Sequence, residues 1–311
     1  TSGVLKCWGD NQFGQLGNGG TSSSTVPVAT DSSVFLSKEI DAGDLHTCAL
    51  LSNGSVGCWG GNASGQLGDN NATTSATPRI TSIVATAVSA GGAHTCAIVT
   101  GGSVVCWGEN GSGQLGDNST TTSSAPVSVQ LPVGTAAKAI SAGGAHTCAV
   151  LSNDAVACWG DNRFGQLGNN STTHSLTPVI LGISAEFVSA GGFHTCAKAT
   201  NGVANCWGSN NFGQIGNNVQ QISRTPILVP EITSATSTSL GGNFTCSNNA
   251  GGVIKCMGDN ESGQLGNGQT ERTAVPTDVQ DPTIFTAATA GGSHACARTS
   301  LGGVKCWGAN N

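Results

Sequence analysis

Cysteine is the residue type with reactive chemistry that has the most regular spacing in this chain. The sequence holds 13 cysteines, and all but one belong to pairs whose members lie ten positions apart. Each pair brackets a short loop, such as Ser52-Asn53-Gly54. A three-residue hairpin loop places the paired cysteines opposite each other on antiparallel strands, where a disulfide can form. The predicted disulfides are Cys48–Cys58, Cys96–Cys106, Cys148–Cys158, Cys196–Cys206, Cys246–Cys256 and Cys296–Cys306.

These cysteines could instead be reduced or bind a metal. Reduced cysteines would act as small buried hydrophobes, but the constant spacing and the hairpin register favour disulfides. A metal site is disfavoured because no C-x-x-C pair supplies a close ligand cluster. Cys7 has no partner ten positions away, so we expect it to be unpaired or to form an intermolecular bond.

Histidine recurs two residues before the first cysteine of a pair. A ring of such histidines near an axis could bind a metal or an anion. The alternative is a structural role, with a ring nitrogen bonded to the backbone of the neighbouring turn. The structural role is favoured because Phe244 replaces histidine once and no carboxylate accompanies the position. The histidines of this set are His46, His94, His146, His194 and His294; His174 lies in a Ser/Thr loop and is expected to be solvated.

Tryptophan directly follows a cysteine at six places. Exposed tryptophans could stack on sugars, whereas buried ones would pack against the neighbouring repeat. Because successive strand residues face opposite sides, and because Met257 fills this position once, we expect packing. The tryptophans are Trp8, Trp59, Trp107, Trp159, Trp207 and Trp307.

No catalytic, cofactor-binding or metal-binding constellation is predicted. The recurring Gly-Gln-Leu-Gly lacks the Lys-Ser/Thr of a phosphate loop, and no Gly-x-Ser-x-Gly elbow precedes a helix. Single acidic residues such as Asp69 and Asp161 flank turns without forming pairs for acid–base chemistry. We therefore predict a protein that is not an enzyme and has no cofactor.

Composition favours an all-β chain in an oxidising compartment. There are 47 glycines, no tyrosine and only 9% charged residues, which is typical of many short strands joined by turns. The net charge of −6 argues against a nucleic-acid or anionic-membrane surface. No apolar run is long enough for a membrane span, and no signal peptide is recognised, as expected of a mature or trimmed chain. The cysteine pairs indicate a secreted or cell-surface protein.

Asparagine sequons are weak support for a glycosylated surface, since many would arise from composition alone. The candidate glycosylation sites are Asn53, Asn62, Asn71, Asn110, Asn118, Asn169, Asn170, Asn243 and Asn260.

Repeats of about 50 residues organise the chain. A typical repeat contains Gly-Gly-x-His-Thr-Cys-Ala, then Val-x-Cys-Trp-Gly, then Gly-Gln-Leu-Gly, then a proline twenty positions after the second cysteine. We expect one strand from each cysteine segment, a third after Gly-Gln-Leu-Gly, and a fourth at the proline on a sheet edge. Four-stranded units around an axis describe a β-propeller. The segments of variable length are expected to be loops: 28–42, 79–88, 127–140, 179–188, 227–240 and 277–290.

The run from Cys158 to Gly168, with Ala190 to Thr195 downstream in the next unit, resembles the repeat of the RCC1 (regulator of chromosome condensation) propeller family. The resemblance covers the whole chain and implies a single RCC1-like β-propeller domain over 1–311, commonly of seven blades. The paired cysteines resemble those of secreted, mostly bacterial members rather than nuclear ones. The family's guanine-nucleotide exchange on a small GTPase is a lesser expectation for this chain.

The strand count is unbalanced between the two ends. The Cys-Trp-Gly strand occurs seven times, counting the variant at Met257, but the His-Thr-Cys strand occurs only six times. The propeller therefore has six or seven blade positions, and the chain is either a fragment or completed by another molecule. A head-to-tail contact of this kind can propagate into a fibre.

The leading hypothesis is an extracellular, non-enzymatic interaction scaffold that self-assembles through its incomplete terminal blades. The alternative is a monomeric secreted module that binds or inhibits a protein or glycan through the variable segments. The expected partners are thus another protein, other copies of the chain, or glycans.

Overall fold

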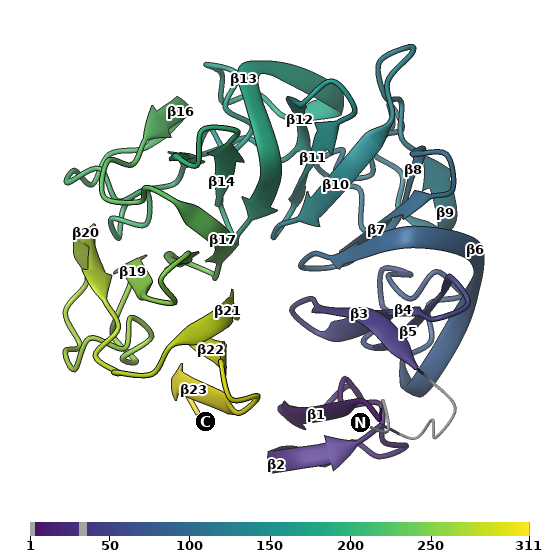
Figure 1. Ribbon diagram of the computed structural model, residues 1–311. Coiled ribbons are helices and arrows are strands. Elements are labelled where there is room, and N and C mark those ends of the chain that lie inside the picture. The colour runs from purple at the N-terminus through teal and green to yellow at the C-terminus, as the bar shows by residue number, and fades with distance from the viewer. Residues whose placement is uncertain (1–3, 31–35, 311) are drawn as a thin grey trace.

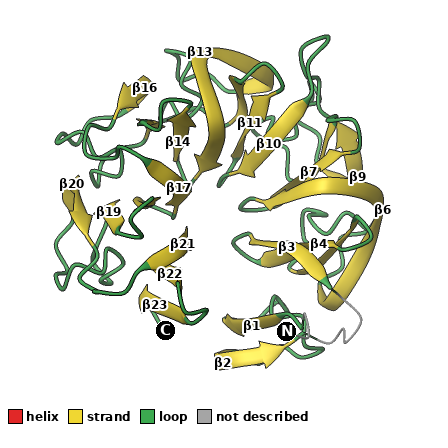
Figure 2. Ribbon diagram, in the orientation of Figure 1, coloured by secondary structure: helices red, strands yellow, loops and turns green. Residues whose placement is uncertain are grey.

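The computed structural model describes residues 4–30 and 36–310, which form a ring of antiparallel sheets around a central axis (Figure 1). Every regular element in these residues is a strand, and turns and loops join the strands (Figure 2). The all-β propeller that the sequence predicts is confirmed. Two incomplete units, at the beginning and the end of the chain, flank five four-stranded blades.

The units follow one another along the chain. The N-terminal ribbon contains β1 (Lys6–Gly9) and β2 (Ser24–Ala29). Blade 1 contains β3 (Ser37–Ala42), β4 (His46–Leu51), β5 (Ser55–Gly60) and the first half of β6 (Ser75–Ala90). Blade 2 contains the second half of β6, β7 (His94–Val99), β8 (Val104–Gly108) and β9 (Ser123–Ser128). Blade 3 contains β10 (Ala137–Ala142), β11 (His146–Leu151), β12 (Ala155–Gly160) and the first half of β13 (Ser175–Ala190).

The remaining units repeat this plan. Blade 4 contains the second half of β13, β14 (His194–Ala199), β15 (Ala204–Gly208) and β16 (Ser223–Leu228). Blade 5 contains β17 (Ala235–Leu240), β18 (Phe244–Asn249), β19 (Ile254–Gly258) and β20 (Thr273–Asp278). The C-terminal blade contains β21 (Phe285–Ala290), β22 (His294–Thr299) and β23 (Val304–Gly308). The ring thus has seven blade positions, and the unbalanced strand count is confirmed.

The cysteine hairpins have the register expected from their loops. In blade 1, Cys48 lies opposite Cys58 and Leu50 lies opposite Val56. The last loop residue has positive φ, at 88° for Gly54 and 67° for Asp154, a conformation that glycine and aspartate tolerate better than most residues. All six predicted pairs are disulfides, with Cα atoms 4.0 to 4.1 Å apart.

The predicted third strand is wrong, and so is the loop assignment of the variable segments. Gly-Gln-Leu-Gly forms two successive turns, in which Gly65 donates to the carbonyl of Asn62 and Gly68 to that of Gly65. Both glycines have positive φ, which a strand does not accommodate. The missing strand instead lies after the proline, inside the segments expected to be loops. β3 and β10 are examples, and 79–88 and 179–188 lie wholly within β6 and β13.

The proline strands are at the outer edges, as predicted. Pro27, Pro126, Pro226 and Pro276 lie in β2, β9, β16 and β20, each of which pairs with a single neighbour. Blades 1 and 2 differ in that β6 runs on from the outer edge of one blade to the inner edge of the next. β13 does the same for blades 3 and 4. Two seven-stranded sheets result.

The hydrophobic core lies between the blades. Between blades 1 and 2, the Cys48–Cys58 disulfide packs with Leu67 against Trp107 of the next blade. Trp59, Trp107, Trp159 and Trp207 are all buried. The packing role predicted for tryptophan is therefore confirmed in the complete blades.

Candidate functional site

The histidine side chains join neighbouring blades. The Nε2 atom of His46 lies 2.9 Å from Thr95 Oγ1 in blade 2. The same bond links His94 to Thr147, His146 to Thr195 and His194 to Thr245 at 2.8 to 2.9 Å. The partner is thus a threonine hydroxyl of the next blade, not the backbone of a turn as the sequence suggested. The threonine directly follows the histidine of the next blade, or Phe244 in the case of Thr245.

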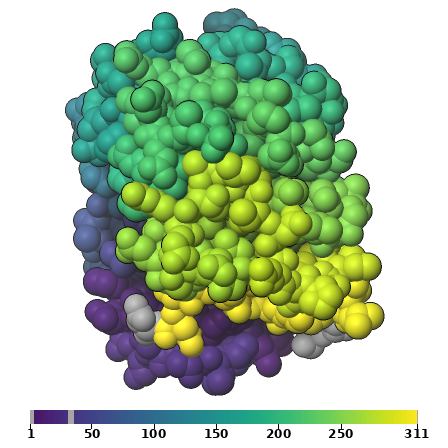
Figure 3. Space-filling model, turned by 90° about the vertical axis from the view of Figure 1, so that its left-hand side faces the viewer, coloured from purple at the N-terminus to yellow at the C-terminus, as the bar shows by residue number. Residues whose placement is uncertain are grey.

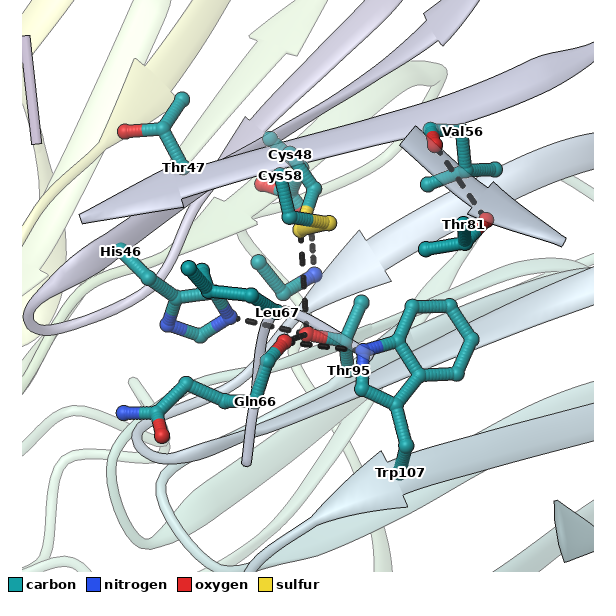
Figure 4. The surroundings of a disulfide bond; sticks show 12 residues. His46, Thr47, Cys48, Val56, Cys58, Gln66, Leu67, Thr81, Thr95 and Trp107 are labelled. Atoms are coloured by element: carbon teal, nitrogen blue, oxygen red, sulfur yellow. Dashed lines mark hydrogen bonds between the residues drawn. A yellow bond between two sulfur atoms is a disulfide. The ribbon is translucent and has the colours of Figure 1, made fainter. Parts of the chain in front are cut away.

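A carbonyl oxygen of the Gly-Gln-Leu-Gly turn completes this junction (Figure 4). Thr95 Oγ1 donates to the carbonyl of Gln66 at 2.8 Å, and Trp107 Nε1 donates to the same oxygen at 2.8 Å. Since the threonine proton goes to that carbonyl, His46 must donate from Nε2, and its Nδ1 is unprotonated. The junction therefore ties histidine, threonine, glutamine and tryptophan into one network.

Burial keeps these histidines neutral. Desolvation lowers the pKa of His46 and His146 to about 4, and that of His94 and His194 to about 3. Their Nδ1 atoms are buried without a hydrogen-bond partner. Within residues 4–30 and 36–310, no group of three or more His, Cys, Asp or Glu side chains is arranged to hold a metal. Each histidine serves as a single neutral donor.

One junction lacks both members of the histidine–threonine pair. Blade 5 has Phe244 where the other blades have histidine, and the C-terminal blade has Ala295 where the others have threonine. These two positions would face each other across the junction, because His194 faces Thr245 one blade earlier. An apolar phenylalanine beside an alanine leaves no buried donor unpaired. The two exceptions in the sequence are therefore one coupled change.

Acidic side chains near the axis were missed by the sequence reasoning. Glu39 and Asp41 lie on the inner strand β3, and Asp44 lies in the turn that follows. Burial raises the pKa of all three carboxyls. Asp41 accepts hydrogen bonds from Ser89 Oγ and the Ala90 backbone at 2.9 Å. The signal was available, since the following blades have serine or threonine at the position of Asp41.

His174 is exposed, as expected of a solvated side chain, and its Nδ1 atom also lies 3.4 Å from Asp161 Oδ1. Asp161 also pairs with Arg163 at 2.9 Å. Although burial works in the opposite direction, hydrogen bonds from Arg163 lower the pKa of Asp161. This cluster closes a turn of blade 3.

The two ends of the chain lie side by side and border an open seam in the ring (Figures 1 and 3). We define the seam by Trp8 of β1 and by His294, Val304 and Cys306 of the C-terminal blade. Trp8 is 42% exposed and Val304 is 58% exposed. Cys306 is exposed, whereas both cysteines of each disulfide in blades 1 to 5 are buried. Side chains at positions that are buried between blades elsewhere in the ring are thus exposed at the seam.

Cys7 lies on the other face of β1. It is partly buried against Ala49, Leu51 and Trp59 of blade 1 and forms no disulfide with another described residue. Burial raises the pKa of its thiol to about 11. The thiol is therefore protonated near neutral pH, which makes it a poor nucleophile.

The sequons fall into different environments. Asn62, Asn110 and Asn260 are fully buried. Their Nδ2 atoms donate to backbone carbonyls in the turn that follows, as Asn62 does to Thr73 at 3.0 Å. Asn169 and Asn243 are half-buried. Four sequons are exposed, at Asn53, Asn71, Asn118 and Asn170. The signal for burial was the occurrence of asparagine four residues after the second cysteine in every repeat.

No helix in the described part of the chain has the length and apolar character that crossing a membrane requires.

Comparisons with known proteins agree with this architecture. The family model for the RCC1-like domain matches residues 2–311. The ultraviolet-B receptor UVR8 of Arabidopsis thaliana is 31% identical over 173 residues, which are 55% of this chain and 28% of that protein. The chain thus matches less than a third of this relative's length.

Two crystal structures share the fold. Prp20p of Saccharomyces cerevisiae, described as binding Gsp1p and histones, aligns with a TM-score of 0.87 at 20% identity, covering 98% of this chain and 80% of that one. Human WBSCR16 aligns with a TM-score of 0.85 at 20% identity, covering 99% of this chain and 82% of that one.

Proposed function

Since the chain belongs to the RCC1-like domain family, we propose that it is a non-enzymatic protein-interaction scaffold that works outside the cell or on its surface. The observation that carries this proposal is the set of six disulfides, one in each cysteine hairpin. Disulfides of this density persist in oxidising compartments and are rare in the cytosol.

The use of the reactive side chains supports a non-enzymatic role. Four of the six histidines, His46, His94, His146 and His194, are neutral and buried in interblade hydrogen bonds. The paired cysteines are oxidised, and the tryptophan indoles of blades 1 to 4 donate to turn carbonyls. Side chains that could carry acid–base, nucleophilic or stacking chemistry therefore hold the blades together.

The test begins with thiol mapping on protein isolated from its source without reductant. Alkylation before and after unfolding, read by peptide mass spectrometry, should find the twelve paired cysteines protected and Cys7 labelled only after unfolding. Free Cys48 and Cys58 in rapidly quenched native protein would contradict the oxidising compartment. Chemical crosslinking of the same preparation should join the chain to a defined second protein, and the absence of any such crosslink would contradict the scaffold.

Self-association through the seam is a second candidate, favoured by the exposure of Trp8 and Val304. Assembly of copies through the seam would cover this apolar surface and could extend head to tail. Sedimentation velocity should show concentration-dependent oligomers that Trp8→Ala and Val304→Asp dissociate. Val133→Asp is the matched control, because Val133 is fully exposed and lies outside the seam. A monomer at every concentration would favour the monomeric binding module instead.

Glycans and nucleotide exchange are tested separately. If the chain is glycosylated, the acceptors are Asn53, Asn71, Asn118 and Asn170, since a glycan at Asn62, Asn110 or Asn260 would displace buried hydrogen bonds. Glycopeptide mapping distinguishes the two groups. Exchange on a small GTPase is supported only by the fold shared with Prp20p at 20% identity. Accelerated release of labelled GDP from a small GTPase would favour it over the scaffold.

A further inference from the structure

A groove opens at the outer rim between blades 4 and 5, beside β16 and β20. Its volume is about 440 Å³, within the range of sites that hold a small ligand or a side chain. The residues that line it include Gly216, Leu228, Pro230, Glu231 and Val275. Leu228 and Val275 are exposed apolar side chains in its walls.

Pro230 explains why this junction is open. In blade 2, the Gln130 backbone N–H donates to the Gly116 carbonyl at 2.9 Å, and in blade 5 Gln280 donates in the same way to Gly266. Pro230 occupies the equivalent repeat position in blade 4 and has no N–H to donate. The Gly216 carbonyl consequently accepts no hydrogen bond from the described residues. The groove thus contains a free backbone acceptor.

The turn beside the groove also departs from the repeat pattern. Val219 and Ile222 are 48% and 40% exposed. The blades on either side have polar residues there: Ser171 and Gln269 at the first position, His174 and Arg272 at the second. This turn borders blade 5, because the Asn218 backbone donates to the Ala274 carbonyl at 2.9 Å. Apolar side chains are therefore exposed in this turn at two positions where the repeats on either side have polar residues.

The buried packing behind Gly216 also differs from that of other junctions. Gly216 contacts Met257 of blade 5, whereas the equivalent Gly116 and Gly168 contact the indoles of Trp159 and Trp207. Methionine is smaller than tryptophan and more adaptable. Changes in the wall, in the turn and in the buried packing behind Gly216 therefore coincide at this junction.

The chemistry of the groove selects a cationic side chain with an aliphatic stem. Two of its lining residues carry acceptors, the Gly216 carbonyl and the Glu231 carboxylate, and Glu231 forms no ion pair with a described residue. Lysine and arginine lay apolar stems along such walls while their charged ends remain hydrogen-bonded. We propose that the groove binds a lysine or arginine side chain of a partner protein. The stem lies on Leu228 and Val275, and the cationic end lies between Glu231 and Gly216.

The inference rests on the proposed protein-binding function and is tested with a random twelve-residue peptide library displayed on phage. Selection on the oxidised chain should enrich peptides in which a lysine or arginine is flanked by aliphatic residues. Fluorescence anisotropy with an enriched peptide should show at least tenfold weaker binding by Glu231→Gln. Pro230→Gln should weaken binding similarly, because it restores the residue that closes the groove in blades 2 and 5. Val133→Asp is the control and should bind as the unmodified chain does.

Three results would overturn the proposal: no enriched peptide, enriched peptides without basic residues, or equal binding by the Glu231→Gln and Pro230→Gln variants. Unchanged melting temperatures establish that the variants are folded, and glutamine already occupies this place in two other blades. If crosslinking finds a partner protein whose affinity both variants leave unchanged, the groove assignment fails while the scaffold stands. If crosslinking finds no partner protein at all, the scaffold itself fails.

Discussion

The junction between blades 2 and 3 and the junction between blade 5 and the C-terminal blade use the same backbone geometry with different side chains. The first is closed by His94 and Thr147, the second by Phe244 and Ala295. A propeller junction can therefore be built from a buried hydrogen bond or from an apolar contact. Both members must change together, because a lone histidine or threonine would leave a polar group unpaired. Four experiments test this comparison.

The largest effect is expected from the tryptophan that fills a closed junction. Trp107→Ala should lower the free energy of unfolding by about 3–5 kcal/mol, because it leaves a cavity in a close-packed interface. Trp8→Ala should cost far less, since Trp8 borders the open seam. Urea unfolding measures both, and equal losses would show that the seam is closed in solution.

Removal of one disulfide should have the next largest effect. Cys48→Ala with Cys58→Ala should cost about 2–3 kcal/mol through loss of the closed ten-residue loop, and somewhat more because its sulfurs are core atoms. The matched pair is Cys296→Ala with Cys306→Ala, whose bridge reaches the exposed Cys306. Calorimetric melting should show the smaller loss for the second pair, and the reverse order would contradict the description of the seam.

The histidine–threonine bond is tested by a double-mutant cycle. Thr147→Ala should cost about 1–3 kcal/mol, because it leaves the His94 Nε2 donor buried and unsatisfied. Combining His94→Phe with Thr147→Ala copies the junction after blade 5 and should recover part of that loss. A combined loss equal to the sum of the single losses would mean that the two residues do not act as a pair.

The smallest effect per site is expected from lowering the pH, which tests the same histidine–threonine junction. His94 has a folded-state pKa of about 3, below its ordinary value of 6.5, so the unfolded chain binds more protons between these values. Stability is therefore full above pH 6.5 and falls as the pH drops below it. In the variant with His94→Phe and Thr147→Ala, the pH dependence of the free energy of unfolding should decrease by the contribution of about one proton taken up on unfolding. Urea unfolding from pH 7 to pH 4 measures this dependence. An unchanged pH dependence would indicate that His94 is protonated in the folded chain as readily as in the unfolded chain.

The hairpins, the disulfides and the family could be predicted from the sequence because those features depend on local spacing. Cys48 and Cys58 are close in the chain, so a loop length was enough to place them. The inner strands were missed because β3 and β6 are identified by pairing with a hairpin that comes later in the sequence. Their segments vary in length and carry no fixed motif. The proline strand was found because proline is confined to edges in any sheet.

The junction chemistry was only partly predictable. The burial of tryptophan followed from its place next to a cysteine, but the partner of His46 could not be inferred, since Thr95 lies about fifty residues away. The groove beside Pro230 was invisible for a similar reason. Its acceptor, the Gly216 carbonyl, is a backbone atom, and the residue fourteen positions later, Pro230, has no N–H to donate to it.

The sixteen-residue strands β6 and β13 make the ring mechanically uneven. Each carries an unbroken backbone from one blade into the next, so blades 1 and 2 share one sheet, and blades 3 and 4 share another. A pulling force or a thermal fluctuation would separate the ring at the boundaries between sheets, where only side chains and turn contacts cross. One of those boundaries lies between blades 4 and 5. Blades 1 and 2 therefore form one stiff unit and blades 3 and 4 another, whereas blade 5 shares no sheet with its neighbours. An opening fluctuation of the ring would increase the separation between β16 and β20.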